Sequence, residues 1–172
     1  MTSEIISPNW YVLHTKSRFE KVVNDGLQKK AFEAFLPTMH VRSKRKDRKI
    51  MLDIPIFPGY TFVKSTLCAE ENLSILKTAG VVRIIGNMSG PVAVDSDVIK
   101  SLQIMTATNE NIITETKFKK GEKVVVLYGP FTGLTGVFSK YKGKGRVYVN
   151  ISLLGQSAAV EIEEDDIKHI AK

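Results

Sequence analysis

The spacing of apolar residues changes near residue 119, and this change limits the fold more than any other feature of the sequence. Before that point, apolar residues recur at both strand and helix spacings. After it, only the alternation of β-strands remains, most clearly in residues 147–153 and 158–162. In a chain of 172 residues, such a switch predicts a mixed domain of helices and strands followed by a small all-β domain.

The first 106 residues predict an α+β sandwich, in which helices pack on a small antiparallel sheet. Expected strands cover residues 10–13, 34–41, 59–63, 81–85 and 92–94, and expected helices cover residues 17–32, 69–78 and 95–105. Ser17 and Glu20 have the spacing of a capping box, which supports a helix start there. Pro37 places the second strand at a sheet edge or at a bulge, because proline cannot donate a hydrogen bond to a neighbouring strand.

Residues 119–172 predict a small β-barrel. Short strands are expected at residues 123–128, 134–141, 147–153 and 158–162, with turns at residues 129–133 and 143–145. Short strands at this density, separated by glycine-rich turns, are typical of small barrels. Residues 107–118 show no periodicity and are predicted to be a linker.

Positive charge is concentrated in one segment. The chain carries a net charge of +7, and residues 42–49 (Arg-Ser-Lys-Arg-Lys-Asp-Arg-Lys) hold six basic residues and one acidic residue. We expect this run to form a hairpin tip or a loop. Such a run either contacts nucleic acid or is simply a solvated loop, and its composition leaves both open.

The sequence lacks the usual arrangements of catalytic or metal-binding residues. A single cysteine, Cys68, excludes an internal disulfide, and the three histidines are scattered. The sequence has neither a phosphate-binding loop nor a Gly-x-Ser-x-Gly motif. We therefore expect a protein that is not an enzyme and that has no cofactor and no metal site. Without a signal peptide or an apolar stretch long enough to cross a membrane, we expect it to be cytoplasmic.

Several motifs resemble those of the NusG family of transcription elongation factors. The N-terminal motifs are Trp-Tyr-Val at 10–12, Phe-Pro-Gly-Tyr at 57–60 followed by Phe-Val at 62–63, and Val-Arg-Ile-Ile-Gly at 82–86. The C-terminal part is similar to a KOW module at residues 121–126, 129–131, 133–137, 155–157 and 160–162. The resemblance implies an N-terminal NusG domain at 1–106, a linker at 107–118, and an SH3-like, five-stranded KOW β-barrel at 119–172.

The resemblance also implies which residues bind RNA polymerase and DNA. Carried over by position, the polymerase-binding surface includes His14, Phe57, Pro58, Tyr60 and Phe62. In that case the rings of Phe57 and Tyr60 should be exposed or half-exposed. Upstream or non-template DNA would be contacted by basic residues near the first helix and in the basic run, namely Lys16, Arg18, Arg42, Lys44, Arg45, Lys46, Arg48 and Lys49.

In the KOW module, the resemblance places Phe131 and Leu134 at the contact with a partner, either the termination factor Rho or a small-subunit ribosomal protein. Residues 140–146 interleave basic residues with Tyr141, which fits either an RNA contact or an ordinary charged hairpin. The regular alternation of residues 147–162 predicts a stable barrel.

The function implied is a monomeric elongation factor that reduces pausing and acts in antitermination of long operons, such as those for surface polysaccharides. The compact length and the basic hairpin resemble specialised paralogues of the family. Two alternatives stay open: a housekeeping member that acts in Rho-linked termination, and a ribosome-associated KOW protein that binds RNA.

Overall fold

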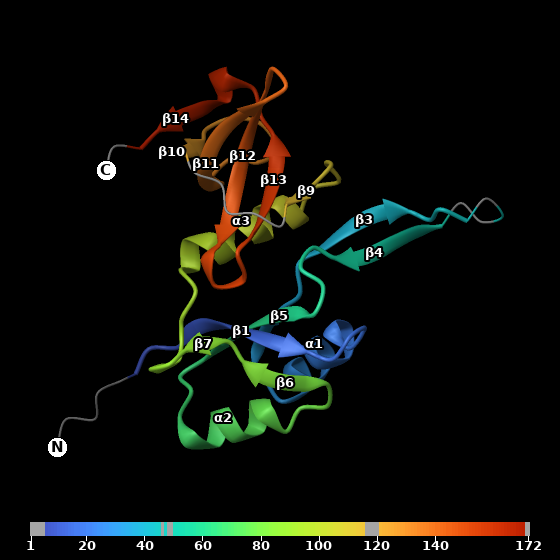
Figure 1. Cartoon of the computed structure of the whole chain (residues 1–172), viewed down its shortest axis with the longest axis vertical. Helices are drawn as coiled ribbons and strands as arrows, with labels where there is room; N and C mark the ends of the chain where they lie inside the picture. Colours follow the sequence, from blue (N-terminus) through green and yellow to red (C-terminus); the bar gives the residue numbers. More distant parts are fainter. Residues whose placement is uncertain (1–5, 46, 48–49, 116–120, 171–172) are drawn as a thin grey trace. The chain divides into compact units, whose positions relative to one another are not determined.

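The structure is a computed structural model that describes residues 6–45, 47, 50–115 and 121–170 (Figure 1). The chain divides into two compact units. The first comprises residues 1–36 and 57–96, and the second comprises residues 37–56 and 97–172. Among the described residues, none of the helices is long and apolar enough to cross a membrane.

The first unit is built on a four-stranded sheet whose neighbouring strands are antiparallel. The strand order is β2-β5-β1-β6, with β1 at Asn9–Thr15, β2 at Glu33–Phe35, β5 at Tyr60–Ser65 and β6 at Val81–Ile84. Successive side chains of a strand point to opposite faces. The consecutive residues Val12 and Leu13 are both fully buried, so both faces of the sheet are covered at the centre of β1.

Two helices cover one face of this sheet. They are α1 at Glu20–Lys29 and α2 at Ala69–Leu76. Their buried residues Val23, Leu27 and Ile75 form a core cluster with Leu13 and Val63 of the sheet. Because Leu13 and Val63 point toward the helices, the residues next to them in β1 and β5 point to the opposite face.

The first unit also contains a short strand pair, β7 at Gly86–Asn87 and β8 at Gly90–Pro91. Beyond it, Val94 forms an isolated bridge with Trp10. The expected strand at 92–94 therefore appears only as this single bridge.

The second unit contains a six-stranded antiparallel sheet in the order β14-β10-β11-β12-β13-β9. The strands are β9 at Ile113–Glu115, β10 at Glu122–Val126, β11 at Thr135–Tyr141, β12 at Lys144–Ile151, β13 at Gln156–Glu161 and β14 at Ile167–His169. Two 3-10 turns, η1 at Ser152–Leu154 and η2 at Glu164–Asp166, follow β12 and β13. The α+β class is confirmed, and residues 119–172 contribute five strands, β10 to β14, as expected. The sixth strand, β9, lies within the range expected to be a linker, where pairing with β13 orders the backbone.

Helix α3, at Ser96–Thr106, belongs to the second unit from Asp97 onward. The buried Ser101 is bonded twice to the backbone of Thr135 at the start of β11. Its hydroxyl accepts from the Thr135 N–H and donates to the Thr135 carbonyl, both at 3.0 Å. These two bonds tie α3 to the sheet that follows it in sequence.

A separate hairpin carries the basic run. It consists of β3 at Thr38–Arg42 and β4 at Met51–Pro55, paired antiparallel. The Ser43 N–H donates to the Ile50 carbonyl at 2.9 Å and continues the ladder toward the tip. The expected strand at 34–41 is instead split between β2 and β3 at Pro37. The edge position that this proline predicts is found for β2, which is the outermost strand of the four-stranded sheet.

Candidate functional site

A pair of rings lies on the sheet face opposite α1 and α2. His14 of β1 and Tyr60 of β5 are direct cross-strand neighbours, with ring centroids 5.5 Å apart and an angle of 35° between the ring planes. We call these two residues the ring pair. Both side chains are half-buried, and the neighbouring Pro58 is exposed. The ring pair and Pro58 therefore present an accessible, largely apolar patch on a rigid sheet.

Phe57 and Phe62 lie beneath this surface. Only 1% of Phe57 and 0% of Phe62 is exposed, and their rings pack edge to face with centroids 6.4 Å apart. We expected both residues on the surface. The difference arises because the Tyr60 N–H closes a turn onto the Phe57 carbonyl at 3.1 Å, so Pro58 and Gly59 form the tip while the Phe57 ring packs inward. Of the two rings expected to be accessible, only Tyr60 is.

Two basic residues lie beside the same end of the sheet. Lys16 and Arg18 follow β1 in an exposed turn. The Thr15 N–H donates to the Gly59 carbonyl at 2.8 Å, which joins the end of β1 to the start of β5. The fold thus brings the basic pair close to the tip at Pro58, although about 40 residues separate them in sequence.

Glu20 takes a role that the sequence did not indicate. The capping box was wrong: Phe19 is the N-cap of α1, and no side chain caps this helix. The Glu20 side chain, in a residue only 7% exposed, instead accepts a hydrogen bond from the Gly59 N–H at 2.7 Å. No local signal could have found this contact, because its partner lies 39 residues further on.

The basic hairpin is amphipathic. In its register, Met39 faces Ile54 and Val41 faces Leu52, so these apolar residues share one side. His40 and Asp53 form an ion pair on the other side. The expected DNA-contacting residues Arg42, Lys44 and Arg45 are exposed, whereas Lys46, Arg48 and Lys49 lie outside the described residues.

The residues expected to contact a KOW partner are largely buried. Phe131 is 4% exposed and Leu134 is 0% exposed, because they anchor the turn between β10 and β11. A pocket of about 390 Å³ opens beside Phe131. Its lining combines apolar and aromatic residues with carboxylates, among them Tyr128, Pro130, Phe131, Glu163 and Asp166. At this end of the unit the pocket is accessible, whereas the Leu134 side chain is not.

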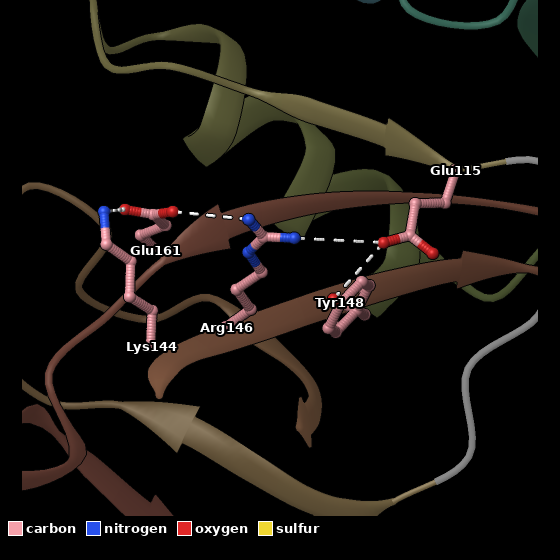
Figure 2. A network of polar contacts seen from close by, with 5 residues as sticks. All are labelled: Glu115, Lys144, Arg146, Tyr148 and Glu161. Carbon is pink, nitrogen blue, oxygen red and sulfur yellow. Dashed lines mark hydrogen bonds and ion pairs between the residues drawn. The ribbon is translucent and has the colours of Figure 1, made fainter. Parts of the chain in front are cut away.

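A network of paired charged residues adjoins this pocket, because its members Lys144 and Glu161 also line the pocket (Figure 2). Arg146 of β12 lies 3.4 Å from Glu161 of β13 and 4.0 Å from Glu115 of β9. Glu115 also accepts from the Tyr148 hydroxyl at 3.4 Å, and Lys144 lies 3.1 Å from Glu161. This network links three strands of the sheet.

The electrostatics of the network follow from these contacts. The Tyr148 hydroxyl raises the pKa of Arg146, and the Glu161 carboxylate adds to this effect. The hydrogen bond from Lys144 holds the pKa of Glu161 below its ordinary value. Lys140 is paired as well, with Glu164 at 2.7 Å. Most basic residues of 140–146 therefore form ion pairs with carboxylates. This favours an ordinary charged hairpin over an RNA contact.

Metal ligands do not gather anywhere in the part of the chain that the structure describes. No group of three or more His, Cys, Asp or Glu side chains is arranged there to hold a metal ion. What the described surfaces offer chemically is binding: an aromatic patch flanked by basic residues, and an acidic pocket.

Comparison with known proteins identifies the family. The family model described as "Transcription termination factor nusG" matches residues 8–103. The protein "Transcription termination/antitermination protein NusG" of Thermus thermophilus is 27% identical over 177 residues, covering 92% of this chain and 96% of that relative. The protein of the same name from Chlamydia trachomatis is 29% identical over 163 residues, covering 88% and 89%.

A solved structure, "Domain interaction in Thermotoga maritima NusG", is similar with a TM-score of 0.56 and 21% identity, covering 95% of this chain and 98% of that one. This similarity supports the same fold. Since the family model matches more than half of the chain and the relatives align over nearly all of it, the chain belongs to the NusG family of transcription termination/antitermination factors.

Proposed function

We propose that this protein is a transcription elongation factor that binds RNA polymerase through the ring pair and Pro58. The observation that carries the proposal is the accessible aromatic patch on the sheet face opposite α1 and α2, where His14 and Tyr60 pack together. Aromatic side chains on a rigid support are frequent anchors of protein interfaces. In this proposal Phe57 and Phe62 do not contact the polymerase but support the patch from below.

Nucleic acid contact is proposed for the basic residues beside the patch. Lys16 and Arg18 are exposed next to the tip at Pro58, where they would meet phosphates of upstream or non-template DNA. The exposed Arg42, Lys44 and Arg45 of the hairpin are proposed to extend this contact. Binding of this kind depends on salt and depends little on sequence.

The second unit is proposed to recruit a further partner, Rho or a small-subunit ribosomal protein. The pocket beside Phe131 supports this, because it combines aromatic and apolar surface with carboxylates. A basic protein segment fits such a lining by charge. We further propose that the factor reduces pausing, acts in antitermination of long operons, including those for surface polysaccharides, and works in the cytoplasm as a monomer without catalytic activity.

The polymerase proposal is tested by a native gel shift of reconstituted elongation complexes. The wild-type protein is compared with His14→Ala/Tyr60→Ala and with Tyr128→Ala/Tyr141→Ala, which removes two exposed tyrosines of the second unit. The proposal predicts that only the ring-pair variant fails to shift the complex. Equal shifts by all three proteins, or an equal shift of nucleic acid without polymerase, would reject it.

The direction of the effect is tested by transcription in vitro. Elongation through a strong pause site and a Rho-dependent terminator is followed with and without the factor. Antitermination predicts shorter pauses and more read-through. Increased termination in the presence of Rho would instead favour a role like that of a housekeeping family member.

A further inference from the structure

The turn that carries Pro58 is clamped at its tip. The Gly59 N–H donates to the Glu20 carboxylate at 2.7 Å, and the Gly59 carbonyl accepts from the Thr15 N–H at 2.8 Å. The N–H of Gly59 is thus bonded to α1, and its carbonyl is bonded to β1. The backbone of Gly59 has a φ of +85°, a left-handed conformation in which glycine is preferred.

The residue that supplies the carboxylate has little freedom to move. Glu20 is the first residue of α1, and only 7% of it is exposed. A hydrogen bond from a backbone N–H to a carboxylate is among the stronger ones, and leaving a buried N–H without a partner is costly. The position of Gly59 is therefore coupled to the position of α1.

Gly59 in turn adjoins both residues of the ring pair. It precedes Tyr60 in sequence, and a Cβ atom on Gly59 would lie 3.9 Å from Cδ2 of the His14 ring. A shift of the Gly59 backbone therefore displaces Pro58 and Tyr60, its neighbours in sequence, and through Tyr60 it changes the packing of the His14 ring. Hydrogen bonds and the ring contact thus connect the tip and the ring pair to the start of α1.

We propose that Glu20 is a positioning residue for the polymerase-binding surface. It acts through Gly59, holding Pro58 and the ring pair in the arrangement that a partner recognises, without touching the partner itself. This inference rests on the proposed function, because it assumes that the ring pair binds the elongation complex. It goes further by assigning a role to a buried residue outside the surface.

Glu71 provides a matched control in the same unit. Its carboxylate accepts hydrogen bonds from the Ser65 hydroxyl at 2.6 Å and from the Thr66 N–H and hydroxyl, both at 2.8 Å. These contacts lie at the opposite end of β5 from Tyr60. Loss of the Glu71 carboxylate should thus weaken the unit without disturbing the ring pair.

The test compares Glu20→Ala, Glu20→Gln and Glu71→Ala in binding to reconstituted elongation complexes, well below each melting temperature. We expect Glu20→Ala to bind about tenfold more weakly, since a hydrogen bond to a charged group is lost. Glu20→Gln should stay within about threefold of wild type, because its amide oxygen can still accept from Gly59. Glu71→Ala should bind like wild type although its melting temperature is lower. Should Glu20→Ala fail to fold, Glu20→Asp takes its place, because the shorter side chain withdraws the carboxylate from Gly59.

A second readout does not depend on polymerase. Amide NMR spectra of the same variants should show an upfield shift of the Gly59 proton in Glu20→Ala, with changes at Tyr60 and His14 that are absent in Glu71→Ala. Unchanged binding by Glu20→Ala, an equal loss by Glu71→Ala, or unchanged Tyr60 and His14 signals would overturn the inference. If the wild-type protein itself does not bind the complex, the proposed function fails, and the NMR comparison alone then decides whether Glu20 positions the ring pair.

Discussion

Two proline-containing turns, one in each unit, use phenylalanine in the same way but differ in what holds them. The first turn is Phe57–Tyr60, and the second turn is Gly129–Gly133. In each, the proline is exposed and the phenylalanine is buried, with Phe57 1% and Phe131 4% exposed. In each, a tyrosine is the accessible aromatic residue: Tyr60 ends the first turn, and Tyr128 directly precedes the second. A phenylalanine in such a motif thus anchors the turn, and the surface is made by its neighbours.

The supports of the two turns differ. The first turn is held from outside, by Glu20 of α1 and Thr15 of β1. In the second turn, Thr132 bonds back to the Gly129 carbonyl through both its hydroxyl at 2.6 Å and its N–H at 3.2 Å. Both turns also have an internal bond and a bond to a strand: the Tyr60 N–H donates to the Phe57 carbonyl in the first, and the Gly133 N–H donates to the Val126 carbonyl of β10 at 2.8 Å in the second. The first turn differs in that a side chain of a helix, Glu20 of α1, also holds its backbone.

The largest effect is expected when the buried phenylalanine ring of each turn is removed. Phe57→Ala and Phe131→Ala should each lower the free energy of unfolding of its own unit by about 3–5 kcal/mol, the usual cost of deleting a buried phenylalanine ring. Chemical denaturation followed by backbone NMR reports which unit is affected. A loss of less than about 1 kcal/mol in either variant would show that the ring is not an anchor.

The next test separates the two tyrosines. Tyr60→Ala should weaken binding to the elongation complex about 30-fold, as expected when an interface anchor is lost. Tyr128→Ala, which removes a residue 64% exposed in the other unit, should leave this affinity unchanged. Fluorescence anisotropy titration of labelled complexes measures both. An equal loss of affinity in the two variants would contradict the claim that only the first turn takes part in polymerase binding.

A smaller effect is expected at the two glycines with almost the same backbone angle. Gly59 has a φ of +85° and Gly129 a φ of +86°, and neither has an atom closer than 3.9 Å to an added Cβ. Gly59→Ala and Gly129→Ala should therefore each cost about 1–2 kcal/mol, from backbone strain alone. Thermal unfolding measures this, and the affinity for the complex should fall only for Gly59→Ala.

The smallest effect concerns acid stability at the far end of β5. Hydrogen bonds from the Ser65 and Thr66 hydroxyls hold the pKa of Glu71 below its ordinary value of 4.5. Because the pKa is lower in the folded state, this contribution to stability is complete above pH 4.5 and is lost as the pH falls through the lowered value. Unfolding curves of wild type and Glu71→Gln should therefore converge on acidification. A difference that grows below pH 4.5 would contradict this.

The sequence predicted the elements whose signals are local. The hairpin at the basic run and the alternation in residues 122–161 both appear in the structure. It did not distinguish Phe57 from Tyr60, because both belong to one motif and only the geometry of the turn decides which ring faces inward. It assigned Glu20 to a capping box because local spacing allowed it, whereas the long-range bond to Gly59 prevailed. Strand β9 was missed because three residues paired only with β13 carry no periodic signal of their own.

The most direct test of the account is site-specific photocrosslinking. A photoreactive phenylalanine analogue replaces Tyr60 in one protein and Tyr128 in another, and each is irradiated in the elongation complex. The account predicts a crosslink from position 60 to an RNA polymerase subunit and none from position 128. Polymerase crosslinks from position 128 alone, or crosslinks from position 60 to nucleic acid only, would contradict the claim that the ring pair is the polymerase-binding surface.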